Sequence, residues 1–432
     1  MTPAARTEAA IGLLDQILSQ PQQPADRIVA GWFRARRYAG AKDRAYVTNL
    51  VYGILRHRGA LEWALGNSDV GAADSRALVL AALVKDEGLP DDDLVSRFSG
   101  ADHAPAPLGA EEQSLLAQLR SNRGDQPDWV RGEYPAALDQ LLRDVFGDDV
   151  VMEMAAVAER APVDLRVNTL KATREAAIAA LANENILAEP TPLSPIGLRL
   201  EERANVAGSK AFRDGLVEVQ DEGSQLLAIL TGALPGETVV DWCAGGGGKT
   251  LALAAGMDNE GRILAFDTSP DRLEAAGHRI ARAGVSIVET HALRDAGALI
   301  AGLQGAVDRV LVDAPCSGSG AWRRNPAAKW RTTPATIAEH AARQREILNA
   351  AAEVVRPGGT LAYATCSLFR AENHEQVDAF LDSHRDFRLG SVPSRWRQFV
   401  SDDPPSEMPL LLLTPLENKT DGFFIAVFER KA

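Results

Sequence analysis

Cysteine is scarce in this chain, with 3 residues among 432. So few cysteines exclude a disulfide framework, and none has another cysteine or a histidine at metal-ligand spacing, so we expect no metal. Long apolar runs are also missing. The stretch from Leu78 to Val84 is among the longest, far below the roughly 20 residues that cross a bilayer. The N-terminus lacks the features of a signal peptide, so we expect a cytoplasmic protein without membrane contact.

The net charge of −13 is unusual for a protein that binds nucleic acid, but it is unevenly distributed. Residues 1–60 carry a charge of +5, residues 61–160 carry −12, and the remainder carries −6. A basic segment on an acidic chain can form a local phosphate-binding face, or it can be an ordinary solvated helix surface. Charge alone favours the solvated surface.

Sequence patterns divide the chain into three parts. Residues 1–149 carry apolar side chains at helical spacing, which predicts an all-α module. Residues 150–222 mix strand-like segments with a helix and predict a small α+β connector. Residues 223–432 alternate strands and helices, the pattern of a parallel sheet with helices on both faces. The fold class is therefore a multidomain chain with a C-terminal α/β domain.

Several strands are expected in the C-terminal part. They lie at residues 238–242, 263–267, 286–289, 309–313, 360–365 and, antiparallel, 423–429. The clearest helix spans residues 336–355 and ends before Pro357, Gly358 and Gly359. Ligands of such sheets bind beyond the carboxyl ends of the strands, so motifs that follow strands are the candidates for a site.

A glycine loop follows the first of these strands. It consists of Cys243, Ala244, Gly245, Gly246, Gly247 and Gly248, and it leads into Lys249 and Thr250. Glycines let a ligand approach the backbone, and the free N–H groups of the next helix can bind its polar groups. The loop therefore indicates a nucleoside cofactor. A P-loop NTPase is one alternative, since Gly248 to Thr250 end its motif, but the motif's first glycine falls at Cys243.

The second strand ends in Asp267, which is placed to bind the ribose hydroxyls of such a cofactor. S-adenosylmethionine and a dinucleotide both fit an acid at this position, and the loop does not choose between them. The dinucleotide match is weak, because four consecutive glycines satisfy part of any glycine fingerprint. The combination of Lys249 and Asp267 argues against a glycine turn without a ligand.

Two cysteines follow two further strands. Cys316 comes just after the strand that ends at Asp313, Cys366 comes directly after Thr365, and each is followed by serine. A thiolate that adds to carbon-6 of cytosine makes carbon-5 nucleophilic enough to accept a methyl group. A base must then remove the carbon-5 proton before the thiolate leaves. Asp313 could hold the proton on ring N3, and Lys249 could contribute to positioning or proton handling.

Three motifs, at residues 242–249, 313–317 and 363–367, together resemble the signatures of the Sun/Fmu-type (NOL/NOP/Sun) RNA cytosine-C5 methyltransferases. Supporting matches lie at residues 166–170, 220–224 and 421–424. The likeness runs from about residue 160 to the C-terminus. Residues 1–149 are similar, more loosely, to the NusB-like RNA-binding domain attached to the bacterial ribosomal RNA members.

This resemblance implies a Rossmann-like domain that uses S-adenosylmethionine, a monomeric enzyme, and an RNA substrate, with small-subunit ribosomal RNA favoured over transfer RNA. It implies that Cys366 is the nucleophile and that Cys316 assists product release. The implied cofactor contacts are Cys243, Ala244, Gly245, Gly246, Gly247, Gly248, Lys249, Asp267 and Asp313.

The sequence departs from the family at two places. The family commonly has Ala-Pro-Gly-Gly in the first motif, whereas here Ala244 is followed by glycine, and the missing proline predicts a more flexible loop. The family usually places an aspartate near the adenine after the third strand. Thr290, His291 and Ala292 stand there instead, with Asp295 further on, so we assign no adenine contact.

Residues 322–331 contain four cations and two tryptophans without an acid: Trp322, Arg323, Arg324, Lys329, Trp330 and Arg331. Such a set suits phosphate binding and base stacking, and its closeness to Cys316 in the sequence favours RNA contact. The alternative is a surface helix whose tryptophans pack inward. A noncatalytic RNA-binding or ribosome-assembly factor is the rival function, and the intact cysteines and glycine loop argue against it.

Overall fold

The computed structural model describes residues 1–67, 70–121 and 124–432, which form two compact units. Unit 1 comprises Met1–Arg160 together with Trp322–Pro334, and unit 2 comprises Ala161–Ala321 together with Ala335–Ala432. Residues 322–334 thus belong to unit 1, although the residues on both sides of them belong to unit 2.

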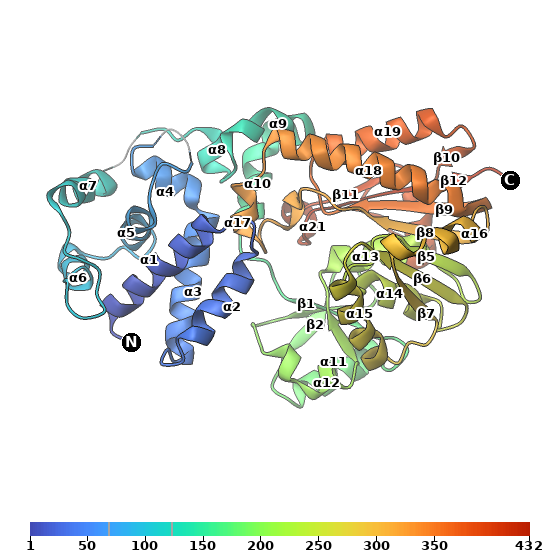
Figure 1. Cartoon of the computed structure of the whole chain (residues 1–432), viewed down its shortest axis with the longest axis horizontal. Helices are drawn as coiled ribbons and strands as arrows, with labels where there is room; N and C mark the ends of the chain where they lie inside the picture. Colours follow the sequence, from blue (N-terminus) through green and yellow to red (C-terminus); the bar gives the residue numbers. More distant parts are fainter. Residues whose placement is uncertain (68–69, 122–123) are drawn as a thin grey trace. The chain divides into compact units, whose positions relative to one another are not determined.

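Unit 1 is helical, as its sequence predicts (Figure 1). Its α-helices are α1 (Pro3–Ser19), α2 (Ala25–Ala35), α3 (Ala41–Arg56), α4 (Arg58–Ala64), α5 (Ser75–Lys85), α6 (Asp91–Arg97), α7 (Ala110–Arg120), α8 (Asp128–Arg131), α9 (Asp139–Phe146), α10 (Val150–Ala158) and α17 (Pro326–Lys329). Helix α5 is central, because every residue from Leu78 to Val84 is buried and α5 packs against α1, α3, α4 and α7.

The apolar run from Leu78 to Val84 is therefore a core helix of unit 1. Across the residues that the structure describes, every helix is too short or too polar to cross a bilayer. Within the same described ranges, no group of three or more His, Cys, Asp or Glu side chains is arranged to hold a metal ion.

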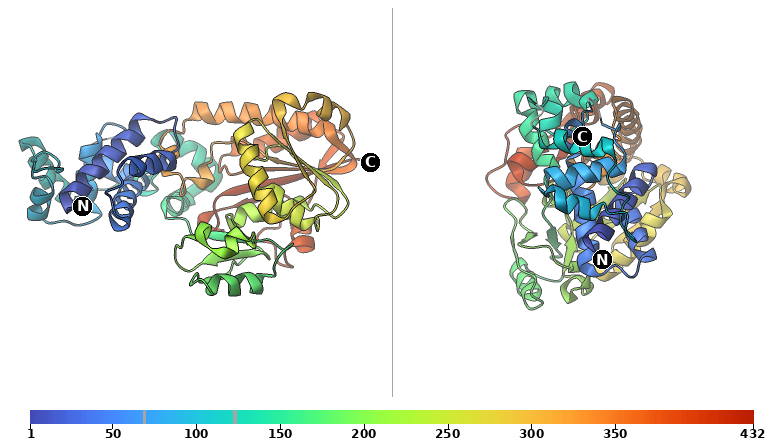
Figure 2. Two further views of the ribbon diagram at one scale, coloured as in Figure 1. Left: turned by 60° about the horizontal axis from the view of Figure 1, so that its bottom comes forward. Right: turned by 90° about the vertical axis from the view of Figure 1, so that its left-hand side faces the viewer.

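Unit 2 begins with a small antiparallel sheet of strand order β2-β3-β1-β4. Its strands are β1 (Asp164–Val167), β2 (Ala188–Pro190), β3 (Gly197–Leu200) and β4 (Val217–Val219), with helices α11 (Arg174–Ala182) and α12 (Lys210–Arg213). Its buried core includes Leu165, Val167, Leu181 and Leu198. Figure 2 shows these green elements gathered beside the larger sheet of the same unit.

The larger sheet has the strand order β10-β12-β9-β8-β5-β6-β7, with β11 paired to β12. Its bounds are β5 (Thr238–Asp241), β6 (Arg262–Asp267), β7 (Val288–Ala292), β8 (Val307–Asp313), β9 (Val355–Thr365), β10 (Phe387–Leu389), β11 (Leu411–Leu413) and β12 (Phe423–Arg430). Strands β5 to β9 are parallel, and β12 pairs with β9 in the antiparallel sense. The expected strands are present, although the one predicted at residues 286–289 begins at Val288. The side chain of Asn259 accepts the Ser286 N–H, so this N–H is not available to β6, and the pairing of β7 with β6 begins at Val288.

Helices cover both faces of this sheet, which confirms the α/β fold class (Figure 1). They are α13 (Glu222–Thr231), α14 (Gly248–Gly256), α15 (Pro270–Ala283), α16 (Gly297–Gly302), α18 (Pro334–Val354), α19 (His374–Ser383), α20 (Val392–Phe399) and α21 (Pro415–Asn418). One buried cluster joins the sheet to α16, α18 and α19, and another joins it to α13, α14, α15 and α20.

Strand β5 lies between β8 and β6, so the order of connection reverses beside β5. At such a reversal, the loops that follow two neighbouring strands run in opposite directions. The space between these loops, at the carboxyl ends of the strands, is a crevice in which a ligand can bind. The glycine loop after β5 and the Asp313 motif after β8 stand on the two sides of this crevice.

Candidate active site

The glycine loop runs from the end of β5 at Asp241 to the start of α14 at Gly248. Gly245 and Gly247 have φ values of +55° and +77°, a region in which side chains are strained. An added Cβ at Gly247 would also lie 3.0 Å from the Cβ of Ala276. Glycine is therefore required at these positions for the loop to take this path.

Asp267 ends β6 beside the loop and is buried. One carboxylate oxygen accepts the Gly245 N–H at 2.9 Å, and the other accepts the Ser269 N–H at 2.8 Å. Each carboxylate oxygen can accept a second hydrogen bond, so Asp267 can hold the loop and still bind a ligand hydroxyl.

Two arginines restrain the loop through its carbonyl oxygens. Arg279 on α15 donates to the Gly246 carbonyl at 2.6 Å, and Arg166 on β1 donates to the Gly248 carbonyl at 2.5 Å. Arg279 is in turn paired with Glu218. The missing proline had predicted a flexible loop, but these contacts fix the loop without it.

Lys249 and Asp313 form an ion pair across the crevice, with 2.7 Å between Nζ and Oδ2. Burial works against a charge on Lys249, but the Asp313 carboxylate outweighs burial, and the pKa of Lys249 lies above its usual value. Lys249 is therefore a stable ammonium group in the crevice.

The two strand-end cysteines meet at this crevice. The Sγ atoms of Cys316 and Cys366 are 3.4 Å apart, within hydrogen-bond distance for sulfur. The hydrogen bond to Cys366, then burial, and then nearby negative charge raise the pKa of Cys316 well above that of a free thiol. Cys316 is thus protonated at neutral pH and is suited to donate to Cys366.

Glu372 connects the loops that carry the two cysteines. Its fully buried carboxylate accepts hydrogen bonds from the Ser317 N–H at 2.8 Å and from the hydroxyl groups of Ser317 and Ser367, both at 2.5 Å. Gln344 on α18 donates a further hydrogen bond at 3.1 Å. Each serine follows a cysteine directly, so one carboxylate fixes the backbone beside both thiols.

A cavity of about 800 Å³ lies over the glycine loop. Its lining includes the loop, Asp267, Asp313 and both strand-end cysteines. This volume lies in the range of sites for small ligands and cofactors. The space that a Cβ on Gly245 would take is empty, so a ligand can lie against the backbone there. Every predicted cofactor and catalytic residue except Gly247 lines this one cavity.

Two family descriptions match the chain. Residues 228–429 match the family described as 16S rRNA methyltransferase RsmB/F, and residues 134–207 match the ferredoxin-like domain of RsmF/B-like methyltransferases. A protein of Sodalis glossinidius named ribosomal RNA small subunit methyltransferase B is 32% identical over 407 residues, covering 89% of this chain and 89% of the relative. The chain belongs to the RsmB/F methyltransferase family.

Solved structures agree with this family. The crystal structure of PH0851 is 28% identical, has a TM-score of 0.78, and covers 100% of this chain and 99% of its own. A methyltransferase homolog from Pyrococcus horikoshii is also 28% identical, with a TM-score of 0.60 over 70% of this chain and 97% of its own. S-adenosylmethionine is the cofactor of this RsmB/F methyltransferase, and the dinucleotide and P-loop NTPase alternatives are set aside.

The RNA-contact prediction for residues 322–331 is wrong for three of its six side chains, which are buried, whereas Arg324 is exposed. In the RsmB/F methyltransferase Trp322, Arg323 and Lys329 are buried in unit 1. Lys329 Nζ donates to the Arg56 carbonyl at 2.9 Å, and the Trp330 indole donates to the Leu55 carbonyl at 2.6 Å. These side chains anchor the segment to α3, as the alternative of inward-packing tryptophans describes.

Sequence reasoning missed the roles of Glu372 and Arg279. An acid six residues after Cys366 was the only local signal for Glu372, and nothing near Arg279 pointed to the loop. No adenine contact is added at residues 290–292, because the cavity is lined there by Leu293 instead.

Proposed function

We propose that this RsmB/F methyltransferase methylates carbon-5 of a cytosine in small-subunit ribosomal RNA through a covalent bond to Cys366. The observation that carries the proposal is the thiol pair, with 3.4 Å between its sulfur atoms, beside the Lys249–Asp313 ion pair. The ribosomal RNA substrate is supported by the name of the Sodalis glossinidius relative, a small subunit methyltransferase.

The cofactor would lie in the 800 Å³ cavity, where it supplies the methyl group. Residues 243–249 would contact it through the backbone, and Asp267 would accept hydrogen bonds from its ribose hydroxyls. Arg166 and Arg279 hold the loop in the conformation that binds it.

Cys366 would attack carbon-6 of the cytosine as a thiolate, in the same cavity as the Lys249 ammonium group. The new carbon–sulfur bond leaves electron density at carbon-5, which then takes the methyl group. Asp313, held by Lys249, would bind the proton at ring N3.

Release would require the opposite steps. The carbon-5 proton passes to a base, the carbon-5–carbon-6 double bond forms again, and the bond to Cys366 breaks. The protonated Cys316 thiol is placed to donate a hydrogen bond to the departing sulfur. Cys316 thus acts after methyl transfer, whereas Cys366 acts before it.

The helical unit would hold the RNA. Arg34 and Arg37 on and beside α2 are exposed, and exposed Tyr38 lies next to them in the sequence. Arginines with an aromatic side chain suit phosphate and base contacts. We assign this unit the RNA-binding role of a NusB-like domain.

Nucleoside mass spectrometry tests the proposal. Small-subunit ribosomal RNA lacking the modification is incubated with the protein and methyl-labelled S-adenosylmethionine, and the digest is expected to contain labelled 5-methylcytidine. A label in another nucleoside would overturn the assigned chemistry. RNA binding without any transfer would favour the noncatalytic assembly factor.

A further inference from the structure

Unit 2 contains a second large cavity at the opposite edge of the sheet from the cysteines. Its volume is about 930 Å³, and it is lined by Arg309 of β8, by β9, β10 and α20, and by the end of β12 with the two residues that follow it. Thr360 lines this cavity and lies six residues before Cys366 in β9, which corresponds to about 20 Å of strand. The cavity is therefore separate from the cofactor site.

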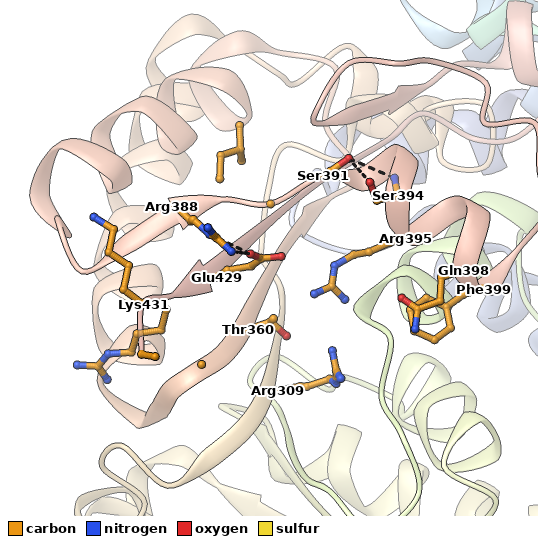
Figure 3. A pocket seen from close by; sticks show the side chains of 15 residues that line it. Arg309, Thr360, Arg388, Ser391, Ser394, Arg395, Gln398, Phe399, Glu429 and Lys431 are labelled. Atoms are coloured by element: carbon orange, nitrogen blue, oxygen red, sulfur yellow. Dashed lines mark hydrogen bonds and ion pairs between the residues drawn. The ribbon is translucent and has the colours of Figure 1, made fainter.

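Positive charge gathers in this cavity. Its lining contains Arg309, Arg388, Arg395, Arg430 and Lys431, together with two acidic groups, the Glu429 side chain and the terminal carboxylate of Ala432. Figure 3 shows Arg388 and Arg395 reaching into the space from two sides, with Arg309 below them. Five cations in one cavity are notable in a chain whose net charge is −13.

Three of the five cations have carboxylate partners. Arg309 pairs with Glu237 at 2.6 Å, Arg388 with Glu429 at 2.9 Å, and Arg430 with Asp386 at 3.0 Å. Each ion pair leaves guanidinium N–H groups for further acceptors, because an arginine has five donors. Counting these partners and the Ala432 carboxylate, the described cavity still holds one cation more than acids.

Arg395 is an arginine of this lining for which the described residues provide no carboxylate ion-pair partner. In the part of the chain that the structure describes, its hydrogen bonds go only to the carbonyl oxygens of Leu230 and Thr231. Burial lowers the pKa of Arg395 to about 10, and the charge of Arg309 acts in the same direction, whereas the carboxylates of Glu429 and Glu237 oppose the shift. Two guanidinium groups that repel each other across a shared space are stabilised by an anion bound between them.

We propose that this cavity binds a phosphate group, held by Arg395 with Arg388 and Arg309. Phosphate oxygens match the planar fork of arginine, and the exposed Ser391 and Ser394 add hydroxyl groups at the rim. The phosphate comes either from a polyribonucleotide or from a free phosphorylated compound. The site needs neither S-adenosylmethionine nor the cysteines.

Arginine modification tests the site on the full-length protein, without cofactor. Phenylglyoxal labels accessible guanidinium groups, and peptide mass spectrometry gives a rate for each arginine. Saturating inorganic phosphate should slow labelling of Arg388 and Arg395 severalfold. Arg397, on the same helix but outside the lining, is the internal control.

Protection by both phosphate and an RNA fragment indicates a polyribonucleotide site. Protection by phosphate alone indicates a free phosphorylated ligand. No protection by either, or equal protection of Arg397, overturns the proposal.

Variants give a second measurement. Arg395→Gln and the exposed Arg388→Gln should each weaken phosphate binding about tenfold, as expected for one lost charged hydrogen-bonding contact. Arg397→Gln should leave it unchanged. If Arg395→Gln fails to fold, Arg388→Gln still tests the site, since the Arg388 side chain is 70% exposed and its replacement should not affect folding. Wild-type phosphate affinity in a folded Arg388→Gln protein would overturn the assignment of Arg388.

Discussion

The Sγ atoms of Cys316 and Cys366 lie 3.4 Å apart, although 50 residues separate the two cysteines. Strands β8 and β9 are parallel neighbours, with Asp313 opposite Ala364, so the two loops start from adjacent backbone positions. Glu372 then joins the loops through the serines that follow the cysteines. The geometry of the thiol pair therefore depends on the strand register and on one buried acid.

Glu372→Gln should slow methyl transfer while leaving S-adenosylmethionine affinity unchanged. Glutamine keeps one acceptor oxygen and replaces the other with an amide that cannot accept the serine hydrogen bond. Losing a hydrogen bond to a charged group costs about 1.5–3 kcal/mol, which predicts a roughly ten- to hundredfold lower rate. The check is steady-state methyl transfer, with kcat expected to fall and the KM for RNA to stay constant.

Glu375→Gln is the matched control, because Glu375 is exposed on the same segment. It should behave as the wild type does. Wild-type turnover in Glu372→Gln would show that the carboxylate is not needed to position the thiols.

Asp267→Ala should weaken S-adenosylmethionine binding roughly ten- to hundredfold, since it removes a charge-assisted contact. It also releases the Gly245 N–H, so Asp267→Asn, which keeps one acceptor, should lose less affinity. Calorimetry measures both, and Asp271→Ala on exposed α15 surface is the control. Unchanged affinity in Asp267→Ala would remove Asp267 from the site.

The stability of unit 1 should depend on Glu133. Burial is the main cause that raises the pKa of Glu133 to about 7, with the charge of Lys329 opposing it. Because the folded chain holds this proton more tightly than the unfolded chain, Glu133 makes folding less favourable as pH rises from 4.5 towards 7. Between pH 5 and pH 7 the wild type should lose about 2 kcal/mol relative to Glu133→Gln.

Urea unfolding of both proteins at the two pH values measures this difference. Glutamine keeps an acceptor for only one of the Gly59 and Ala60 N–H groups, which the two Glu133 carboxylate oxygens bind, and this loss is the same at both pH values. Glu111→Gln, at an exposed position of α7, should follow the wild type. A constant difference between wild type and Glu133→Gln would mean that Glu133 is ionised at its ordinary pKa.

Reversing Arg34 and Arg37 to glutamate should weaken RNA binding and flatten its salt dependence. The logarithm of the affinity falls as the logarithm of the salt concentration rises, and each lost phosphate contact makes this negative slope shallower by roughly 0.7–0.9. Arg36 is left intact because its guanidinium stacks on Trp32 at 3.4 Å from the ring centroid. Filter binding across a salt series gives the slope, and an unchanged slope would support the solvated-surface alternative.

The sequence predicted the parts of the site that follow from strand ends. The carboxyl ends of parallel strands lie at one edge of a sheet, so motifs after β5, β6, β8 and β9 had to converge there. This reasoning placed Lys249, Asp267, Asp313 and both cysteines at one cavity, where the structure has them.

Contacts between distant segments could not be predicted in this way. Arg166 reaches the Gly248 carbonyl across 82 residues, and Lys329 reaches the Arg56 carbonyl across 273. Every residue has a backbone carbonyl, so a cation that binds one cannot be matched to its partner from residue types alone. For that reason the sequence of residues 322–331 predicted an exposed basic surface, although several of these side chains are buried among the helices of unit 1.

Covalent trapping on a denaturing gel tests the division of roles between the thiols most directly. Cys366→Ala should abolish methyl transfer and form no RNA adduct, because no bond to carbon-6 can form. Cys316→Ala should accumulate a denaturation-resistant complex that requires both S-adenosylmethionine and the target cytosine, because release fails after the methyl group has moved. Adducts from Cys366→Ala but not from Cys316→Ala would reverse the assignment, and wild-type turnover in both variants would rule out covalent catalysis by either cysteine.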